Sequence, residues 1–456
     1  MTDRRSAREF LALVTDDFAE LPRPEDRSAP DGPLGWPGYD AARARAAECT
    51  GEEESVVCGT GHVAGVRAVL VAFEFGFLGG SLGRRTGDRL EAAYTYARAH
   101  RLPVVPLVAT GGSRMQEGML ALTQLQRVAR ESALTREAGL AQIAVVRDPA
   151  TGGGWATLGA GADVVLALPG AQVGFAGSRV RPPDADPAAY TAEAQVAAGS
   201  ADAVVPADEL RGTLGRWLRL LTAPSGDPAP VPGPLGARDL PGTGWDAVRR
   251  ARAPGRPRAG AYLDAYFTHR VALLGDRCGG TDPDGMLCGF GQHAGRTVAY
   301  AAQTGTATRP AGYRTATRLI RLAERLGIPV LTLVDTPGAA NDAAAERQGV
   351  GAAIAELFGV MASVRTPVTT LVIGEGGSGG ALALAAPGRT WATPDSYFSV
   401  IAPELAAAIL KRGPEEVEAT ADQLRLRPQD LAELGVIRTG DQLFPGTGDR
   451  RSGERM

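Results

Sequence analysis

Apolar and polar positions follow the same order in two parts of the chain. Each part opens with two strand-like stretches joined by a glycine turn. An amphipathic helical pattern follows, and then two apolar runs that end at glycines. In the first part these segments read HVAGVRAVLVAFEF, GDRLEAAYTYARAHR, LPVVPLVATGG and GLAQIAVVRDPATGG. In the second part they read MLCGFGQHAGRTVAYAAQ, TATRLIRLAERLG, IPVLTLVDTPG and TPVTTLVIGEGGSGG. Apolar strands that alternate with amphipathic helices are typical of α/β units with buried strands, so the order predicts one such unit repeated in tandem.

Segments without apolar periodicity divide the chain further. Residues 222–258 are rich in Pro, Gly, Ala and Arg, which is typical of a linker outside both cores. A short helix is expected over Ser6–Leu21. The expected organisation is an N-terminal helix and Pro-rich lead over 1–40, a first domain over 41–221, the linker over 222–258, a second domain over 259–440 and a polar tail over 441–456.

The composition is that of a folded globular protein. Hydrophobic residues make up 44% of the 456 residues and charged residues 22%, which excludes a wholly disordered or fibrous chain. No apolar run approaches the ~20 residues that span a bilayer, and the charged N-terminal segment lacks the apolar centre of a signal peptide. The net charge of −3 indicates no nucleic-acid-binding surface. We therefore expect a cytoplasmic protein that binds neither membrane nor nucleic acid.

The cysteine and histidine residues do not form the common metal-binding motifs. Their spacings fit neither a CxxC zinc ribbon nor an HExxH motif, so we expect no metal site. The residues concerned are Cys49, Cys58, Cys278, Cys288, His62, His100, His269 and His293.

Three of the expected strands run into glycine-rich turns that precede a helix. The turns are centred on Gly111–Gly112, Gly152–Gly154 and Gly376–Gly380. Glycine lets the backbone approach a ligand closely, and the first turn of a helix presents N–H groups that lack acceptors. Such turns bind a phosphate or the oxyanion of a reacting carbonyl group. Tight packing of helix on strand would explain one such turn, but three of them in a repeated frame favour ligand binding.

Side-chain catalysts are few by comparison. The chain has no GxSxG elbow and no P-loop, and Lys411 is its single lysine. The acidic residues Glu117, Asp335 and Glu375 lie near the turns, where they would act as acids, bases or helix caps. A chain with few nucleophiles and many backbone donors suits a reaction whose main demand is stabilisation of an enolate or oxyanion.

Longer motifs around these turns resemble one enzyme family. The segments FEFGFLGGSLGRRTGDRL, ATGGSRMQEGMLALTQL and DPATGGGWATLGAGADVVLALPGAQVGFAGSRV resemble the β subunit of bacterial acetyl-CoA carboxylase carboxyltransferase. Its α subunit is similar to PAGYRTATRLIRLAERLGIPVLTLVDTPGA, AERQGVGAAIAELFGVM, VIGEGGSGGALALA and SYFSVIAPELAAAILKR. The chain therefore looks like a β–α fusion, similar in layout to the β chains of acyl-CoA carboxylases. The resemblance implies an α/β fold of two crotonase-like (ClpP/crotonase, spiral β–β–α) domains in tandem.

The resemblance also implies a reaction and the residues that serve it. The family moves a carboxyl group from carboxybiotin to the α-carbon of an acyl-CoA, with acetyl-CoA to malonyl-CoA the expected case. By resemblance, the N–H groups of Gly111 and Gly112 hold the thioester enolate oxygen, and those of Gly380 and Ala381 hold the ureido oxygen of biotin. The further substrate-binding residues, with Arg114 expected at the CoA diphosphate, are Gly79, Gly80, Arg114, Gly152, Gly153, Gly376, Gly377 and Gly379.

The other parts of a carboxylase are expected on other chains. Lys411 is flanked by Leu410 and Arg412 rather than by the methionines of a biotinylation site. Biotin carboxylase and a biotin carboxyl carrier protein are therefore the expected partners. Because each half has one donor pair, we expect a homo-oligomer whose active site joins Gly111–Gly112 of one chain to Gly380–Ala381 of another.

Three features depart from the family pattern. The chain has no CxxC zinc ribbon, Ala340-Asn341-Asp342 stands where Tyr-Pro-Gly usually follows DTPGA, and the loop from Gln303 to Ala307 has no lysine. Two alternatives therefore stay open: a biotin-independent decarboxylase of malonyl thioesters, and a non-catalytic structural subunit. Intact glycine turns in both halves favour carboxyl transfer over a structural role.

Overall fold

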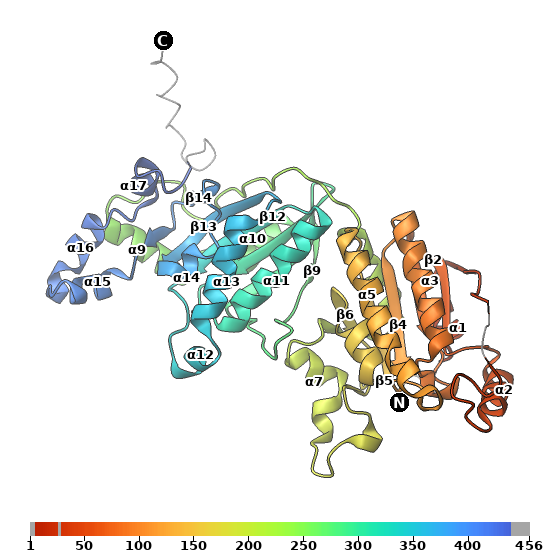
Figure 1. Cartoon of the computed structure of the whole chain (residues 1–456). Helices are drawn as coiled ribbons and strands as arrows, with labels where there is room; N and C mark the ends of the chain where they lie inside the picture. The colour runs from red at the N-terminus through yellow and green to blue at the C-terminus, as the bar shows by residue number, and fades with distance from the viewer. Residues whose placement is uncertain (1–4, 26–28, 439–456) are drawn as a thin grey trace. The chain divides into compact units, whose positions relative to one another are not determined.

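The computed structural model describes residues 5–25 and 29–438 (Figure 1). Contacts divide the chain into two compact units. Unit 1 comprises residues 1–223 with 277–280, and unit 2 comprises residues 224–276 with 281–456. The polar tail expected over 441–456 lies outside the described residues.

Unit 1 is built on one mixed sheet with the strand order β1-β2-β3-β4-β5-β6-β8, in which β7 also pairs with the end of β5. Strand β2 is antiparallel to both of its neighbours, β1 and β3, and the pairs from β3 onwards are parallel. The strands are β1 (Asp17–Glu20), β2 (Val56–Val63), β3 (Val66–Phe73), β4 (Val104–Thr110), β5 (Ile143–Thr151), β6 (Val164–Ala167), β7 (Val173–Gly174) and β8 (Ala203–Val204). The helices are α1 (Ala7–Val14), α2 (Tyr39–Thr50), α3 (Arg84–His100), α4 (Gly118–Leu122), α5 (Gln124–Glu137), α6 (Gly152–Gly154), α7 (Ala192–Ala197) and α8 (Ala207–Leu221).

The central strands of unit 1 are buried as their apolar sequences predict. Every residue of β4 is buried, and α3 packs beside α5 along the sheet (Figure 1). The helix expected over Ser6–Leu21 is shorter than predicted: it ends at Val14 because residues 17–20 form β1, which pairs with β2. Since Phe10 and Val14 are fully buried, α1 belongs to unit 1 rather than to a separate lead.

Unit 2 repeats the same plan. Its strand order is β14-β13-β12-β11-β10-β9, and β15 pairs with the end of β13. The strands are β9 (His269–Ala272), β10 (Met286–His293), β11 (Arg296–Gln303), β12 (Val330–Thr336), β13 (Val368–Gly377), β14 (Thr390–Ala392) and β15 (Tyr397–Ser399). The helices are α9 (Gly244–Arg252), α10 (Ala259–Tyr266), α11 (Pro310–Leu326), α12 (Ala343–Arg347), α13 (Val350–Ser363), α14 (Ser378–Leu382), α15 (Pro403–Ile409), α16 (Val417–Gln423) and α17 (Pro428–Glu433).

The strands of the two units match in order, as the repeated pattern predicts, except that β8 of unit 1 has no counterpart among the described strands of unit 2. In each, an antiparallel hairpin leads into two parallel strands: β2-β3-β4-β5 in unit 1 and β10-β11-β12-β13 in unit 2. Both hairpins turn on an Ala-Gly pair with positive φ angles, the geometry of a tight two-residue hairpin. These pairs are Ala64-Gly65 and Ala294-Gly295.

The segment 222–258, expected as a linker outside both cores, is instead folded onto unit 2 from residue 224 onwards. Its helix α9 buries Ala247, Val248 and Ala251 in a cluster with Tyr397 and Leu426. The Thr369 hydroxyl also donates a hydrogen bond to the carbonyl oxygen of Ala229. The linker prediction is therefore wrong for most of this segment. The segment is rich in Pro, Gly and Arg, but it also contains the apolar helix face of α9, which the composition does not indicate.

The described residues form neither a membrane-spanning helix nor a metal-binding cluster. None of their helices is both long and apolar enough to cross a membrane. Over 5–25 and 29–438, no group of three or more His, Cys, Asp and Glu side chains is placed to hold a metal ion.

Candidate active site

The loops that follow β4 and β12 have the same backbone design. In each, the threonine that ends the strand accepts a hydrogen bond from the glycine two residues later: Gly112 N–H to Thr110 Oγ1 at 3.0 Å, and Gly338 N–H to Thr336 Oγ1 at 3.2 Å. Gly112 and Gly338 have φ angles of 106° and 144°, a conformation that favours glycine. These loops therefore correspond residue for residue, with Ser113 at the place of Ala339.

The turns that follow β5 and β13 correspond as well. Thr151 pairs with the last residue of β7, and Gly377 pairs with the last residue of β15. The next residues, Gly152 and Ser378, have left-handed φ angles of 63° and 58°. It follows that Gly153–Gly154 in unit 1 occupy the place of Gly379–Gly380 in unit 2. The expected donor pairs, Gly111–Gly112 and Gly380–Ala381, are therefore not equivalent positions of the repeat.

In unit 1, the two N–H groups expected to hold an oxyanion already have acceptors. Gly111 N–H donates to the Gly79 carbonyl oxygen at 2.8 Å, and Gly112 N–H donates to Thr110. Among the described residues, Ser113 N–H and Gly153 N–H donate no hydrogen bond. The turns that carry them are adjacent, because a Cβ atom built on Gly152 would lie 3.3 Å from the Cα of Gly112.

Unit 2 has unpaired N–H donors at the places of Ser113 and Gly153 and also at Gly380, among the described residues. Within the described part of the chain, the N–H groups of Ala339, Gly379 and Gly380 have no acceptor. A Cβ atom on Gly380 would lie 2.5 Å from the nitrogen of Ala339, so these two turns touch. A Cβ atom on Gly379 would meet nothing within 4 Å, which leaves open space beside the donors. Such a group of fixed N–H donors can stabilise a negatively charged oxygen.

Other expected substrate-binding glycines serve the packing of the turns. A Cβ atom on Gly80 would clash with the carbonyl oxygen of Ala109, and one on Gly377 with that of Pro337. One on Gly376 would lie 2.6 Å from the ring of Phe398. Gly79 has free space around its Cα and presents its carbonyl oxygen to Gly111. In these places glycine allows the strands and turns of the site to approach one another closely.

The expected contact of Arg114 with a diphosphate does not fit the structure. Arg114 is 1% exposed, and its guanidinium forms a bidentate ion pair with the fully buried carboxylate of Glu54. It also donates hydrogen bonds to the hydroxyl of Tyr39 and the carbonyl oxygen of Ser81. With its donors used inside the protein, Arg114 holds the base of the β4 turn together and is closed to a ligand.

Burial raises the pKa of the Glu54 carboxyl group, but its ion pair and hydrogen bonds with Arg114, together with a hydrogen bond from Ser55 N–H, hold that pKa below its usual range. Glu117 acts as a cap, since it accepts a hydrogen bond from Arg84 N–H at the start of α3. Of the three roles that the sequence allows for Glu117, namely acid, base and helix cap, the structure favours the cap.

The acidic residues of unit 2 are held by arginines from the segment expected as a linker. Arg256 lies 2.5 Å from the fully buried carboxylate of Asp335. Arg252 of α9 lies 2.8 Å from Glu375, which also accepts a hydrogen bond from the hydroxyl of Tyr397. Sequence reasoning did not identify Arg252 and Arg256, because they lie in a segment without an evident apolar period.

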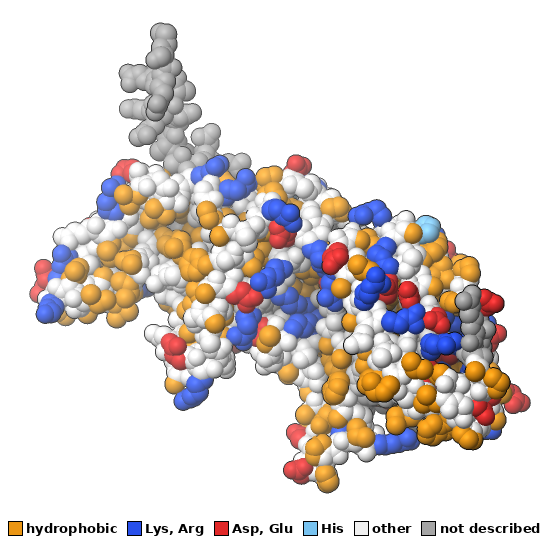
Figure 2. Space-filling view, viewed as in Figure 1, with side chains coloured by type: hydrophobic (Ala, Val, Ile, Leu, Met, Phe, Trp, Pro, Cys, Tyr) orange, Lys and Arg blue, Asp and Glu red, His pale blue; other side chains and the backbone are white. Residues whose placement is uncertain are grey.

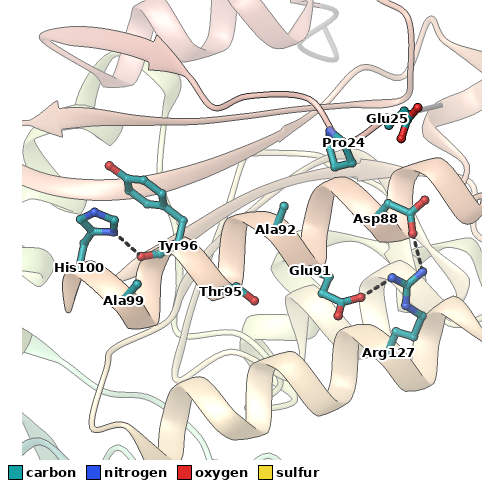
Figure 3. A pocket seen from close by; sticks show the side chains of 10 residues that line it. All are labelled: Pro24, Glu25, Asp88, Glu91, Ala92, Thr95, Tyr96, Ala99, His100 and Arg127. Atoms are coloured by element: carbon teal, nitrogen blue, oxygen red, sulfur yellow. Dashed lines mark hydrogen bonds and ion pairs between the residues drawn. The ribbon is translucent and has the colours of Figure 1, made fainter.

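One cavity, of about 690 Å³, lies apart from these turns. It is lined by residues of α3 and α5 together with Pro24 and Glu25. Figure 3 shows Arg127 of α5 pointing to Asp88 and Glu91 of α3 across it. None of the expected site residues lines this cavity, so it is not the candidate active site.

Comparison with known proteins agrees with this organisation. Residues 37–220 match the carboxyl transferase domain, and residues 242–442 match the acetyl co-enzyme A carboxylase carboxyltransferase-like family. The acetyl-coenzyme A carboxylase carboxyl transferase subunits beta/alpha of Salinispora arenicola are 41% identical over 95% of this chain and 81% of their own length. A probable biotin-dependent acyl-coenzyme A carboxylase beta3 subunit of Mycobacterium bovis is 35% identical over 96% of this chain and 90% of its own length.

Solved structures confirm the predicted fold of two tandem crotonase-like domains. Transcarboxylase 12S, solved as a hexamer with hydrolysed methylmalonyl-coenzyme A bound, has a TM-score of 0.76 at 20% identity over 95% of this chain and 86% of that chain. A single-chain, multi-domain long-chain acyl-CoA carboxylase has a TM-score of 0.72 at 20% identity over 95% of this chain and 45% of that chain. Taken with the matches of both halves in sequence, the chain belongs to the acetyl-CoA carboxylase carboxyltransferase family and is a carboxyl transferase with fused β-type and α-type domains.

Proposed function

We propose that this chain transfers the carboxyl group of carboxybiotin to the α-carbon of acetyl-CoA, giving malonyl-CoA. The observation that carries the proposal is the matched set of unpaired backbone donors, Ser113 and Gly153 in unit 1 and Ala339, Gly379 and Gly380 in unit 2. Relatives along nearly the whole chain are named as acetyl-CoA carboxylase carboxyl transferase subunits, which favours acetyl-CoA as the acceptor.

Unit 1 would hold the acyl-CoA thioester. When the α-carbon loses its proton, negative charge gathers on the thioester oxygen, and fixed N–H donors in a site closed to water stabilise that charge. We assign this role to Ser113 N–H and Gly153 N–H, in place of the N–H groups of Gly111 and Gly112, which have internal acceptors. Gly152 supports them, because its left-handed conformation starts the turn.

Unit 2 would hold biotin through its ureido oxygen. That oxygen needs converging donors and free space in front of them, and the turn at Gly379 and Gly380 offers both. The Ala381 N–H, in the same helical turn, completes the set that the family resemblance implies. Carboxybiotin, carried on a separate protein, would supply the carboxyl group.

A complete site would join unit 1 of one chain to unit 2 of another. Each unit carries exposed apolar side chains close to its turns in sequence or strand pairing. In unit 1, Met115 and Met119 follow the turn at Ser113. In unit 2, Val400 follows β15, which pairs with Gly377, and Leu405 lies on α15. Figure 2 shows hydrophobic side chains gathered over α15, which carries Leu405. Exposed apolar patches of this kind are typical of protein interfaces, so they support a homo-oligomer. Biotin carboxylase and the carrier protein would be further partners.

The acyl group can be tested with the reverse reaction. Purified protein is incubated with free biotin and malonyl-CoA, methylmalonyl-CoA or a longer carboxyacyl-CoA, and loss of the carboxyl group is followed with and without biotin. We expect biotin-dependent loss that is fastest from malonyl-CoA. A preference for methylmalonyl-CoA would reject the proposed substrate, and equal loss without biotin would identify a decarboxylase.

A further inference from the structure

The carbonyl oxygen of Gly380 is held by two side chains from other elements. Gln303, the last residue of β11, donates to it through Nε2 at 3.1 Å, and Tyr313, near the start of α11, donates through its hydroxyl at 3.2 Å. Both side chains are fully buried. The N–H of Leu384, which would reach this carbonyl in a longer helix, donates to Ala381 instead. The side chains therefore take the place of the missing helical hydrogen bond.

Holding a carbonyl oxygen also fixes the N–H of the same peptide group. The C=O of Gly380 and the N–H of Ala381 belong to one planar unit and point in opposite directions. Two donors on the oxygen lock the plane and polarise the amide, which strengthens its N–H as a donor. Burial raises the pKa of the Tyr313 hydroxyl, so this group stays protonated at neutral pH.

Unit 1 shows that the fold does not require these two side chains. The repeat places Phe73 at the position of Gln303, since each ends the second strand of its hairpin. It places Gly87 at the position of Tyr313, four residues into the matching helix. The carbonyl oxygen of Gly154, at the place of Gly380, accepts no side-chain hydrogen bond among the described residues. The double anchor is therefore a special feature of unit 2.

Gln303 is a poor choice for the stability of the fold, compared with an apolar residue of similar size at the same position. Its Oε1 atom is buried and has no hydrogen-bond partner within the described part of the chain. An unsatisfied buried oxygen costs stability that an apolar side chain of the same size would not cost. Its Nε2 group, by contrast, donates two hydrogen bonds, one to the Gly380 carbonyl oxygen and one to Thr308 Oγ1 at 3.3 Å.

We propose that Gln303 and Tyr313 are positioning residues for the carboxyl-transfer step, because together they aim and polarise the Gly380–Ala381 peptide toward the ureido oxygen of biotin. The inference rests on the proposed function. It assigns the two side chains to the biotin half of the reaction and to no step of acyl-CoA binding.

Three variants test the anchor, namely Tyr313→Phe, Gln303→Met and the double variant. The matched control is Tyr300→Phe, which removes a buried hydroxyl bonded to the Val271 carbonyl oxygen on the far side of the same sheet. The measurements are kcat and KM for biotin-dependent carboxyl loss from malonyl-CoA, acyl-CoA affinity by calorimetry, and Tm.

We expect kcat to fall about 10-fold in each single variant and about 10²-fold or more in the double variant, approaching the loss of one oxyanion donor. Acyl-CoA affinity should stay within about 2-fold of wild type in all of them, and Tyr300→Phe should keep the wild-type kcat. Wild-type kcat in the double variant, or an equal loss in Tyr300→Phe, would overturn the anchor while leaving the proposed function intact. A wild-type protein without biotin-dependent transfer would reject the proposed function and this inference with it.

Discussion

At the scale of single residues, the adjacent glycines Gly379 and Gly380 are required for different reasons. A Cβ atom on Gly380 would press on the backbone nitrogen of Ala339, whereas one on Gly379 would enter open space. We predict that Gly380→Ala separates the two turns of unit 2 and lowers kcat for biotin-dependent transfer about 10²-fold. Gly379→Ala should keep kcat within a few-fold but raise KM for biotin, because its methyl group stands before the donors. Steady-state kinetics with free biotin distinguishes the two.

The control for these variants is Gly351→Ala. Gly351 lies on α13, and a Cβ atom there also meets nothing within 4 Å. This variant should match wild type in both constants. If Gly380→Ala also behaves as wild type, the turn is a packing feature and the donor assignment fails.

The buried pair of Arg114 and Glu54 gives a second prediction at this scale. Removing one partner of a buried ion pair leaves an uncompensated charge and typically costs about 3–5 kcal/mol. Arg114→Met should therefore lower the free energy of unfolding by that amount at pH 7, while Arg114→Met combined with Glu54→Leu should recover part of it. Denaturant unfolding measures both. A stable Arg114→Met variant with weakened CoA binding would instead restore the diphosphate role.

The same pair makes stability depend on pH. Because Arg114 holds the folded-state pKa of Glu54 below the ordinary value of about 4.3, the stabilisation is fully present above that value and is lost as the pH falls through the lower folded-state pKa. The free energy of unfolding of wild type should therefore fall as the pH drops below about 4. The fall should be smaller in the double variant Arg114→Met with Glu54→Leu, which has no carboxyl group at this position. Parallel curves for the two proteins would contradict this account.

At the scale of elements, helix α9 contacts the strand that leads to the glycine turn of unit 2. Arg252 bonds Glu375 in the strand that leads to Gly379, and it also pairs with Glu404 of α15 at 2.5 Å. Arg252→Gln should loosen this strand end and lower kcat for biotin-dependent transfer about 10-fold, with acyl-CoA affinity unchanged. The control Arg249→Gln alters an arginine of the same helix that is 67% exposed. Equal effects of the two variants would show that α9 is only a surface helix.

The elements also show how far sequence reasoning reaches. The duplicated strands and hairpins could be predicted, because runs such as VVPLVAT and the Ala-Gly turns carry their structure locally. Helix α9 could not, because its buried face rests on small and scattered apolar residues that pack on distant Tyr397 and Leu426.

The donor assignment within the site was equally out of reach from sequence. The sequence alone predicts where the glycine turns lie. Which N–H groups are unpaired, however, depends on partners such as the Gly79 carbonyl, which meets Gly111 only after folding. The burial of Arg114 likewise depends on Glu54, sixty residues away in sequence.

At the scale of the whole molecule, the proposed site needs two chains. Gly152→Val should inactivate unit 1, because a β-branched residue is strained at its left-handed φ of 63°, while Gly380→Ala weakens unit 2. Each variant alone should lose most activity. Co-expressed variants should regain about a quarter of the wild-type activity if oligomers form at random, because about a quarter of the sites then combine an intact unit 1 with an intact unit 2. Sedimentation should show an oligomer. Activity that is not regained, or an active monomer, would reject the shared site.

The most direct test of the central claim follows the carboxyl group of labelled malonyl-CoA in the presence and absence of free biotin. The account predicts that wild type forms acetyl-CoA together with carboxybiotin, at a rate that depends on biotin and falls about 10²-fold in Gly380→Ala. Release of carbon dioxide at the same rate without biotin, or a rate in Gly380→Ala equal to that of wild type, would contradict it.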